Sequence, residues 1–242
     1  MIISNYNKNL HQDKETLMDY ALTYKTPAEI NSGMIRVYNN MAQAVIVSML
    51  VSALVASDAA LMAFFFTGIM KWVVIFAPLA AIFGVGYVLG NNPTRFVAKA
   101  CLFGFAALMG LSFASIFVIY TGASIASAFF GAAILFLTMS VYGYFTKQSL
   151  DSIGKYLFVA LIAIIITSIV NIFIGSSLLQ TIISAVAVVV FLGLTAYDTQ
   201  KIREQLMESD GPAIEVMGAL TLYLDFINLF LSLLHLFGDR KE

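Results

Sequence analysis

Seven stretches of mostly apolar residues, separated by short polar or glycine-containing breaks, dominate the chain after residue 35. Each is close to the ~20 residues that a helix needs to cross the hydrocarbon core of a bilayer. The pattern therefore predicts an all-α integral membrane protein with seven transmembrane helices. The predicted spans are Val37 to Ala56, Trp72 to Leu89, Phe96 to Tyr120, Ile125 to Phe145, Ile153 to Ile174, Leu178 to Tyr197, and Ala213 to Phe237.

Three connections between these spans are informative. The run ALMAFFFTGIM after Asp58 is too short to cross the bilayer again, so it is either an extension of the first helix or an interfacial connection. The three residues from Gly175 to Ser177 leave so little chain that the fifth and sixth spans must form a tight antiparallel hairpin. The longest predicted connection runs from Glu204 to Pro212 and is acidic.

Composition agrees with the membrane class. Hydrophobic residues make up 60% of the 242 residues, charged residues 11%, and the mean hydropathy is +0.90, whereas roughly 25% of the residues of a soluble domain are charged. The net charge of -1 argues neither for nor against any partner. No cluster of basic residues suggests nucleic acid, so the lipid bilayer is the expected partner. The pattern does not set the oligomeric state, and a monomer is compatible with it.

The chain divides into three parts. Residues 1–33 are polar and of mixed charge, which predicts a flexible cytoplasmic segment without the apolar core of a cleaved signal peptide. Residues 34–238 form the predicted transmembrane domain, and residues 239–242 form a short tail.

Basic residues beside the span ends predict the orientation in the membrane, because lysine and arginine collect on the cytoplasmic side. With a cytoplasmic N-terminus and an outside C-terminus, eight basic residues lie inside and three lie outside. The inside residues are Lys25, Arg36, Arg95, Lys99, Lys147, Lys155, Lys201 and Arg203, and the outside residues are Lys71, Arg240 and Lys241.

Asp198, Asp225 and His235 are the ionisable residues that remain once those at the span ends are set aside. A carboxylate at a helix centre costs about 2.5–3.5 kcal/mol by insertion scales, so it is tolerated chiefly beside a polar partner or a water pathway. His235 lies about a turn from the outer end, where an interfacial or hydrogen-bonded histidine is expected. The two aspartates match in depth if the sixth helix continues past Arg203 and the turn around Glu215 stands in the cytoplasmic headgroups.

Polar side chains share one face of the last span, at intervals of four and three residues. They are Thr221, Asp225, Asn228, Ser232 and His235. Such a stripe must face the bundle interior or an aqueous cavity, because lipid cannot satisfy it. On the sixth span Thr195 precedes Asp198 by three residues, so we expect Thr195, Thr221, Asn228 and Ser232 near the two acids. Taken singly, Asn228 and Ser232 are better explained by hydrogen bonds to neighbouring helices.

Asp198 and Asp225 would act as a coupled pair if their helices bring them together, because two carboxylates in a dry site cannot both stay ionised cheaply. A shared proton would hold the helices together. Its loss would make the carboxylates repel each other and offer oxygen ligands to a hard cation such as calcium. The residues therefore predict a pH-sensitive cation leak with weak, transient calcium binding at Asp198 and Asp225. No cofactor and no catalytic residue are expected, because the sequence shows no nucleophile constellation, phosphate loop or metal cluster.

Two segments that contain these acids, GLTAYDTQKI (Gly193 to Ile202) and LTLYLDFINLFL (Leu220 to Leu231), resemble the signature segments of the Bax inhibitor-1 family. This family is also called the transmembrane BAX inhibitor motif family, and the likeness is to its bacterial branch. It extends over nearly the whole chain after the first 30 residues. Three further similar stretches are MIRVYNNMA (34–42), FAALMGLSFASIFVIYTGASIA (105–126) and SVYGYFTK (140–147).

The resemblance implies a seven-helix fold in which the C-terminal helix is central and the other six surround it. It also implies a pH-sensitive calcium leak controlled by an aspartyl pair, here Asp198 and Asp225, in the inner membrane of a bacterium. Some members latch the pair with a basic residue on the second helix. This chain has none between Lys71 and Arg95, so no latch is expected.

Two other classes of function compete with the leak. Bacterial members of the family are linked to an ATP-dependent membrane protease, so the chain could instead regulate membrane-protein quality control through its polar N-terminal segment. The Tyr197–Asp198 dipeptide also matches the YD pair of intramembrane aspartyl proteases. Those enzymes need a second acid in a GxGD context, however, and Asp225 stands in Leu-Tyr-Leu-Asp, which argues against an enzyme.

Overall fold

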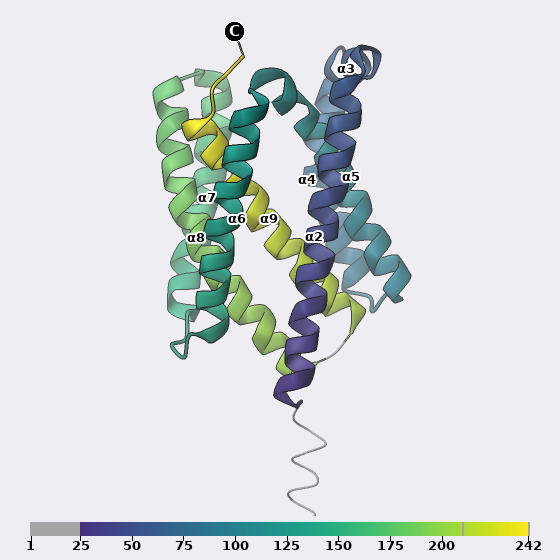
Figure 1. Ribbon diagram of the computed structural model, residues 1–242, viewed down its shortest axis with the longest axis vertical. Coiled ribbons are helices and arrows are strands. Elements are labelled where there is room, and N and C mark those ends of the chain that lie inside the picture. The colour runs from purple at the N-terminus through teal and green to yellow at the C-terminus, as the bar shows by residue number, and fades with distance from the viewer. Residues whose placement is uncertain (1–24, 210, 242) are drawn as a thin grey trace, which may run out of the picture.

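Eight helices account for nearly all of the residues that the computed structural model describes, 25–209 and 211–241 (Figure 1). Seven of these helices are long and apolar enough to cross a membrane, which confirms the predicted all-α fold with seven spans. The helices are α2 (Pro27–Ser57), α3 (Ala59–Phe66), α4 (Met70–Leu89), α5 (Arg95–Ile119), α6 (Gly122–Phe145), α7 (Asp151–Ile174), α8 (Ser177–Glu208) and α9 (Pro212–Phe237).

The first and sixth spans are longer than their apolar stretches. Helix α2 begins at Pro27 because Thr26 and Glu29 form a capping box at its N-terminus. Helix α8 continues beyond the predicted span end at Tyr197 to Glu208, which meets the stated condition that the sixth helix continues past Arg203. The long connection predicted from Glu204 is reduced to residues 209–211. The extra turns of α8 are amphipathic: Ile202 and Leu206 are buried and hold the helix against its neighbours.

The short apolar run after Asp58 forms a helix of its own rather than an extension of α2. Asp58 ends α2 in an extended conformation, and its carboxylate accepts hydrogen bonds from the backbone N–H groups of Ala60 and Leu61. An N-cap aspartate of this kind starts a new helix. At the other predicted hairpin, Gly175 ends α7 with a φ of 69°, which lets the chain turn directly into α8.

Helix α9 runs diagonally through the middle of the bundle and packs against α2, α4, α5, α6 and α8 (Figure 1). In its most apolar 18-residue window, 72% of the residues are buried, against 6% for α7. Helix α7 packs on α8 alone among the seven spans and reaches α9 only through it. The helix that carries Asp225 is therefore the one most enclosed by protein.

The two ends of the described chain lie at opposite ends of the bundle, as an odd number of spans requires (Figure 1). Lys25 donates a hydrogen bond to the carbonyl of Leu206 near the end of α8, and we call this the Lys25 end. At the other end, Arg240 forms an isolated antiparallel bridge with Tyr120, and we call this the Arg240 end.

A buried hydrogen-bond cluster ties α9 to α2 and α5. The Tyr223 hydroxyl, on a fully buried side chain, lies 2.7 Å from the Ser48 hydroxyl, and Ser48 lies 2.8 Å from the carbonyl oxygen of Ala106. Since Ser48 can donate its proton to Ala106, Tyr223 donates to Ser48. The Tyr223 hydroxyl therefore needs Ser48 as its hydrogen-bond acceptor, whereas the Ser48 hydroxyl keeps the Ala106 carbonyl as its acceptor without Tyr223.

Ser48→Ala should for this reason destabilise the protein more than Tyr223→Phe. The serine variant leaves a buried phenol without a partner, which costs about 1–3 kcal/mol, whereas the phenylalanine variant forgoes one net hydrogen bond of about 0.5–1.5 kcal/mol. Thermal unfolding in detergent measures both, with Ser57→Ala, an exposed serine of the same helix, as the control. A larger loss for Tyr223→Phe would contradict the assigned direction of the bond.

Candidate functional site

The structure brings the side chains of Asp198 on α8 and Asp225 on α9 close enough to interact with each other. Asp225 is 4% exposed, and Asp198 is half-buried. Within residues 25–209 and 211–241, Oδ2 of Asp225 is the only buried side-chain nitrogen or oxygen that lacks a hydrogen-bond partner. The site thus joins two carboxyl groups from the last two spans and leaves one carboxyl oxygen free to bind a proton or a cation.

The contact between the two carboxyl groups has a direct chemical meaning. A carboxylate only accepts hydrogen bonds, so a hydrogen bond between two carboxyl groups requires a proton on one of them. In the interior of the bundle the alternative, two facing negative charges, is opposed by burial and by their mutual repulsion. Two carboxyl groups placed in this way could hold one proton between them.

Hydroxyl groups from two other helices hold α8 beside Asp198. The buried Thr199 hydroxyl lies 3.0 Å from that of Ser140 on α6, and Ser140 in turn is hydrogen-bonded to the Tyr38 hydroxyl on α2. Sequence reasoning missed this chain of hydroxyls. Tyr38 and Ser140 lie within two of the stretches that carry the family resemblance, which is the signal that could have identified them.

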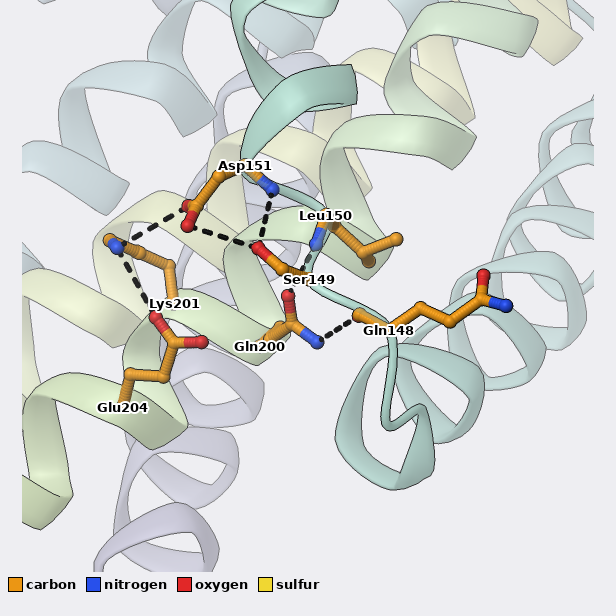
Figure 2. A network of polar contacts seen from close by, with 7 residues as sticks. All are labelled: Gln148, Ser149, Leu150, Asp151, Gln200, Lys201 and Glu204. Atoms are coloured by element: carbon orange, nitrogen blue, oxygen red, sulfur yellow. Dashed lines mark hydrogen bonds and ion pairs between the residues drawn. The ribbon is translucent and has the colours of Figure 1, made fainter.

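The turn between α6 and α7 holds α8 from the other side, as Figure 2 shows. The Gln200 side chain accepts a hydrogen bond from the Leu150 N–H at 2.8 Å and donates one to the Gln148 carbonyl oxygen at 2.9 Å. On the next residue, the Lys201 ammonium lies 3.5 Å from Asp151 and 3.2 Å from Glu204. Thr199 and Gln200, the two residues after Asp198, are therefore both hydrogen-bonded to other helices or their turns, and these bonds fix the position of Asp198.

The residues of the predicted polar stripe have other hydrogen-bond partners than those expected. The four side chains expected near the pair each donate a hydrogen bond to the carbonyl four residues earlier in their own helix. They are Thr195, Thr221, Asn228 and Ser232. The interpretation of Asn228 and Ser232 as bonds between helices is therefore wrong, because their donors turn back along α9. His235 is exposed, and its ring centroid lies 6.2 Å from that of Tyr120.

Charge at the Lys25 end of α9 is neutralised by two arginines. The buried carboxylate of Glu215 lies 2.7 Å from Arg36 of α2 and 3.9 Å from Arg95 of α5. This pairing connects three helices around the first turn of α9 and was not predicted. Arg36 and Arg95 were noted in the sequence only as markers of orientation.

The metal-binding capacity of the site is limited to the aspartates. In the part of the chain that the structure describes, no cluster of three or more histidine, cysteine, aspartate or glutamate residues could hold a metal ion. Two carboxylates give a hard cation such as calcium only part of the six to eight oxygen ligands that it takes.

The fold and this site define a multi-pass helical membrane protein with an acidic pair between its last two spans. A family model described as "Inhibitor of apoptosis-promoting Bax1" matches residues 30–242. The chain belongs to the Bax inhibitor-1 family, as its signature segments predict.

Bacterial relatives resemble the chain over nearly all of its length. Inner membrane protein YbhL of Escherichia coli strain K12 is 40% identical over 221 residues, which cover 88% of this chain and 94% of the relative. An uncharacterized protein of Rickettsia prowazekii is 36% identical over 239 residues, covering 93% and 100% of the two chains. One of Deinococcus radiodurans is 34% identical over 231 residues, covering 93% and 99%.

Proposed function

We propose that this protein is a pH-sensitive leak for cations, calcium among them, and that Asp198 and Asp225 gate it. The observation that carries the proposal is the contact between their carboxyl groups within the bundle, with Oδ2 of Asp225 left unpartnered. Ionisable groups inside membrane spans mark ion pathways and proton relays, because burying them without such a role is costly.

Gating follows from the charge of the pair. With one proton shared, Asp198 and Asp225 hold α8 and α9 together and present little net charge to a cation. When the proton leaves, the two carboxylates repel each other, the helices separate at this point, and four carboxylate oxygens become available to a hard cation. Flux should therefore rise as pH rises through the range in which the pair loses its shared proton.

We further propose that the protein lies in the inner membrane of a bacterium with its N-terminus in the cytoplasm. The Escherichia coli relative is an inner membrane protein by name, which supports the compartment. The excess of lysine and arginine beside the predicted inner ends of the spans, eight against three, supports the orientation. In this orientation Glu215, Arg36 and Arg95 face the cytoplasm.

Calcium uptake by reconstituted vesicles tests the function directly. Purified protein is placed in vesicles that contain a calcium-sensitive dye, and uptake is followed over a series of pH values set equally on both sides. We expect uptake above that of protein-free vesicles, increasing with pH. Uptake equal to that of empty vesicles at every pH would rule out the leak.

Regulation of an ATP-dependent membrane protease stays a prediction of the sequence. It depends on the polar N-terminal segment, of which residues 1–24 lie outside the described residues. The two functions are compatible, because the aspartyl pair lies in α8 and α9 and not in that segment.

A further inference from the structure

A cavity of about 290 Å³ lies between α2, α5 and α6 towards the Arg240 end, with α9 as its floor. Its lining is almost wholly apolar and rich in aromatic rings. Met49 of α2, Phe117 of α5, Ala126 and Phe130 of α6, and Phe230 of α9 represent the four helices that form it. The cavity is distinct from the acidic pair, since neither aspartate lines it.

The cavity exists because α6 leans away from α2 in this half of the molecule. Helix α6 packs closely on α8 and α9 but not on α2 or α5, and its hydroxyl contact with α2, Ser140 to Tyr38, lies towards the Lys25 end. Figure 1 shows α9 in view between α2 and α6. Met49 and Phe130 are 48% and 65% exposed, so apolar side chains continue from the cavity onto the outer surface of these two spans.

Polar groups in the lining give water little to bind. The Ser48 hydroxyl is bonded to Tyr223 and Ala106, and the Ser52 hydroxyl donates to the carbonyl of Met49. A water molecule needs two to four polar partners to be stable in a cavity, and an empty space would deprive the lining of dispersion contacts. In a protein that spans a bilayer, the molecule available at this depth to fill an apolar space is a lipid acyl chain.

Positive charge stands at the end of this cavity. The Lys241 ammonium donates a hydrogen bond of 2.7 Å to the carbonyl of Phe117, a residue of the lining, and Arg240 is held beside Tyr120 by the antiparallel bridge. The Asp239 N–H is fixed by the Ser124 hydroxyl at 2.9 Å. An ammonium has three donors, so two remain on Lys241 for an oxyanion. The chain end thus places the Lys241 ammonium beside the lining, with Arg240 as the residue before it.

We propose that the cavity binds one acyl chain of an anionic phospholipid, whose phosphate group contacts Lys241 and Arg240. The acyl chain supplies the missing contacts between α2 and α6, and the two cations recognise the headgroup by its negative charge. Binding of this lipid would fix the C-terminal tail against α5 and α6 and fill the space above the central helix.

Native mass spectrometry of the purified full-length protein tests the proposal, with phosphatidylglycerol and phosphatidylcholine of identical acyl chains as the probes. We expect one phosphatidylglycerol to be retained about tenfold more strongly than phosphatidylcholine, the scale of one hydrogen bond to a charged group. Ala126→Phe, which fills the cavity, should abolish retention of both lipids. Ala123→Phe is the matched control, because Ala123 is an exposed alanine of the same helix outside the lining.

The headgroup is tested separately by the double variant Arg240→Gln and Lys241→Gln. This variant leaves the cavity intact, so it should lower retention of phosphatidylglycerol to that of phosphatidylcholine without changing the latter. Equal retention of the two lipids by the unaltered protein would overturn the proposal, as would full retention by Ala126→Phe. If the unaltered protein were a dimer, and Ala126→Phe were a monomer with unchanged bound lipid, the cavity would belong to a contact between two copies of the chain. That result would also overturn the proposal.

Discussion

Replacing Asp198 and Asp225 together by asparagine is expected to abolish the pH dependence of calcium uptake and to hold the protein in its closed state. Asparagine has the shape of the protonated acid and can hydrogen-bond across the pair, but it cannot ionise. Two unit charges at ~4 Å repel by about 4 kcal/mol at an effective dielectric constant of roughly 20. Since 1.4 kcal/mol corresponds to a tenfold change in an equilibrium, removing this repulsion should lower uptake at high pH by at least about tenfold.

Each single variant, Asp198→Asn or Asp225→Asn, should show the same loss of calcium uptake at high pH as the double variant, because the repulsion needs both charges. Asp58→Asn is the matched control: it also removes an aspartate, but asparagine caps a helix as well as aspartate does, and Asp58 lies outside the pair. The assay is the vesicle uptake described above. Uptake by the double variant that keeps the magnitude and pH profile of the unaltered protein would show that the pair does not gate the pathway.

Adding a single methyl group at Gly143 is expected to destabilise the whole bundle. A Cβ at this position of α6 would lie 2.2 Å from the carbonyl oxygen of Ala196 on α8, a backbone atom that cannot rotate away. Overpacking of this kind costs about 1–3 kcal/mol, occasionally more. Because Ala196 is two residues before Asp198, Gly143→Ala should also displace the aspartate and weaken the pH dependence of calcium uptake.

Gly131→Ala is the matched control on the same helix. A Cβ there meets only a methyl carbon of Leu233 at 3.8 Å, an ordinary contact, and alanine favours the helix over glycine by about 1 kcal/mol. The midpoint of thermal unfolding in detergent should therefore be lower for Gly143→Ala than for the unaltered protein, and unchanged or higher for Gly131→Ala. Equal midpoints for the two variants would mean that α6 and α8 are not closely packed at Gly143.

The number of spans could be predicted from the sequence because hydrophobic length reports directly on the thickness of a bilayer. Apolar length alone does not give the ends of α2 and α8, because these ends depend on caps and on burial. Thr26 and Glu29 extend α2, and the buried Ile202 and Leu206 extend α8 through a polar stretch. The same extension brings Asp198 into the middle of a helix, where its depth can match that of Asp225.

The two acids could be selected from the sequence because the free-energy cost of a carboxylate in an apolar span is high enough to indicate a functional residue. Their neighbours could not be selected. Ser140, Thr199 and Gln200 are uncharged, and their importance comes from which helices face each other, which periodicity within one helix does not reveal. The hydrogen bonds of Asn228 and Ser232, two residues of the predicted polar stripe, turn back along their own helix.

The proposed gate depends on one proton held between the carboxyl groups of Asp198 and Asp225. The most direct test is an experimental structure of the unaltered protein in one lipid environment at low and at high pH, with the separation of the two carboxyl groups as the measured quantity. We predict oxygen atoms about 2.5–2.7 Å apart at low pH, the length of a bond from a carboxylic acid to a carboxylate, and a clear separation at high pH. Carboxyl groups that are apart at low pH, or equally close at both, would contradict the shared proton.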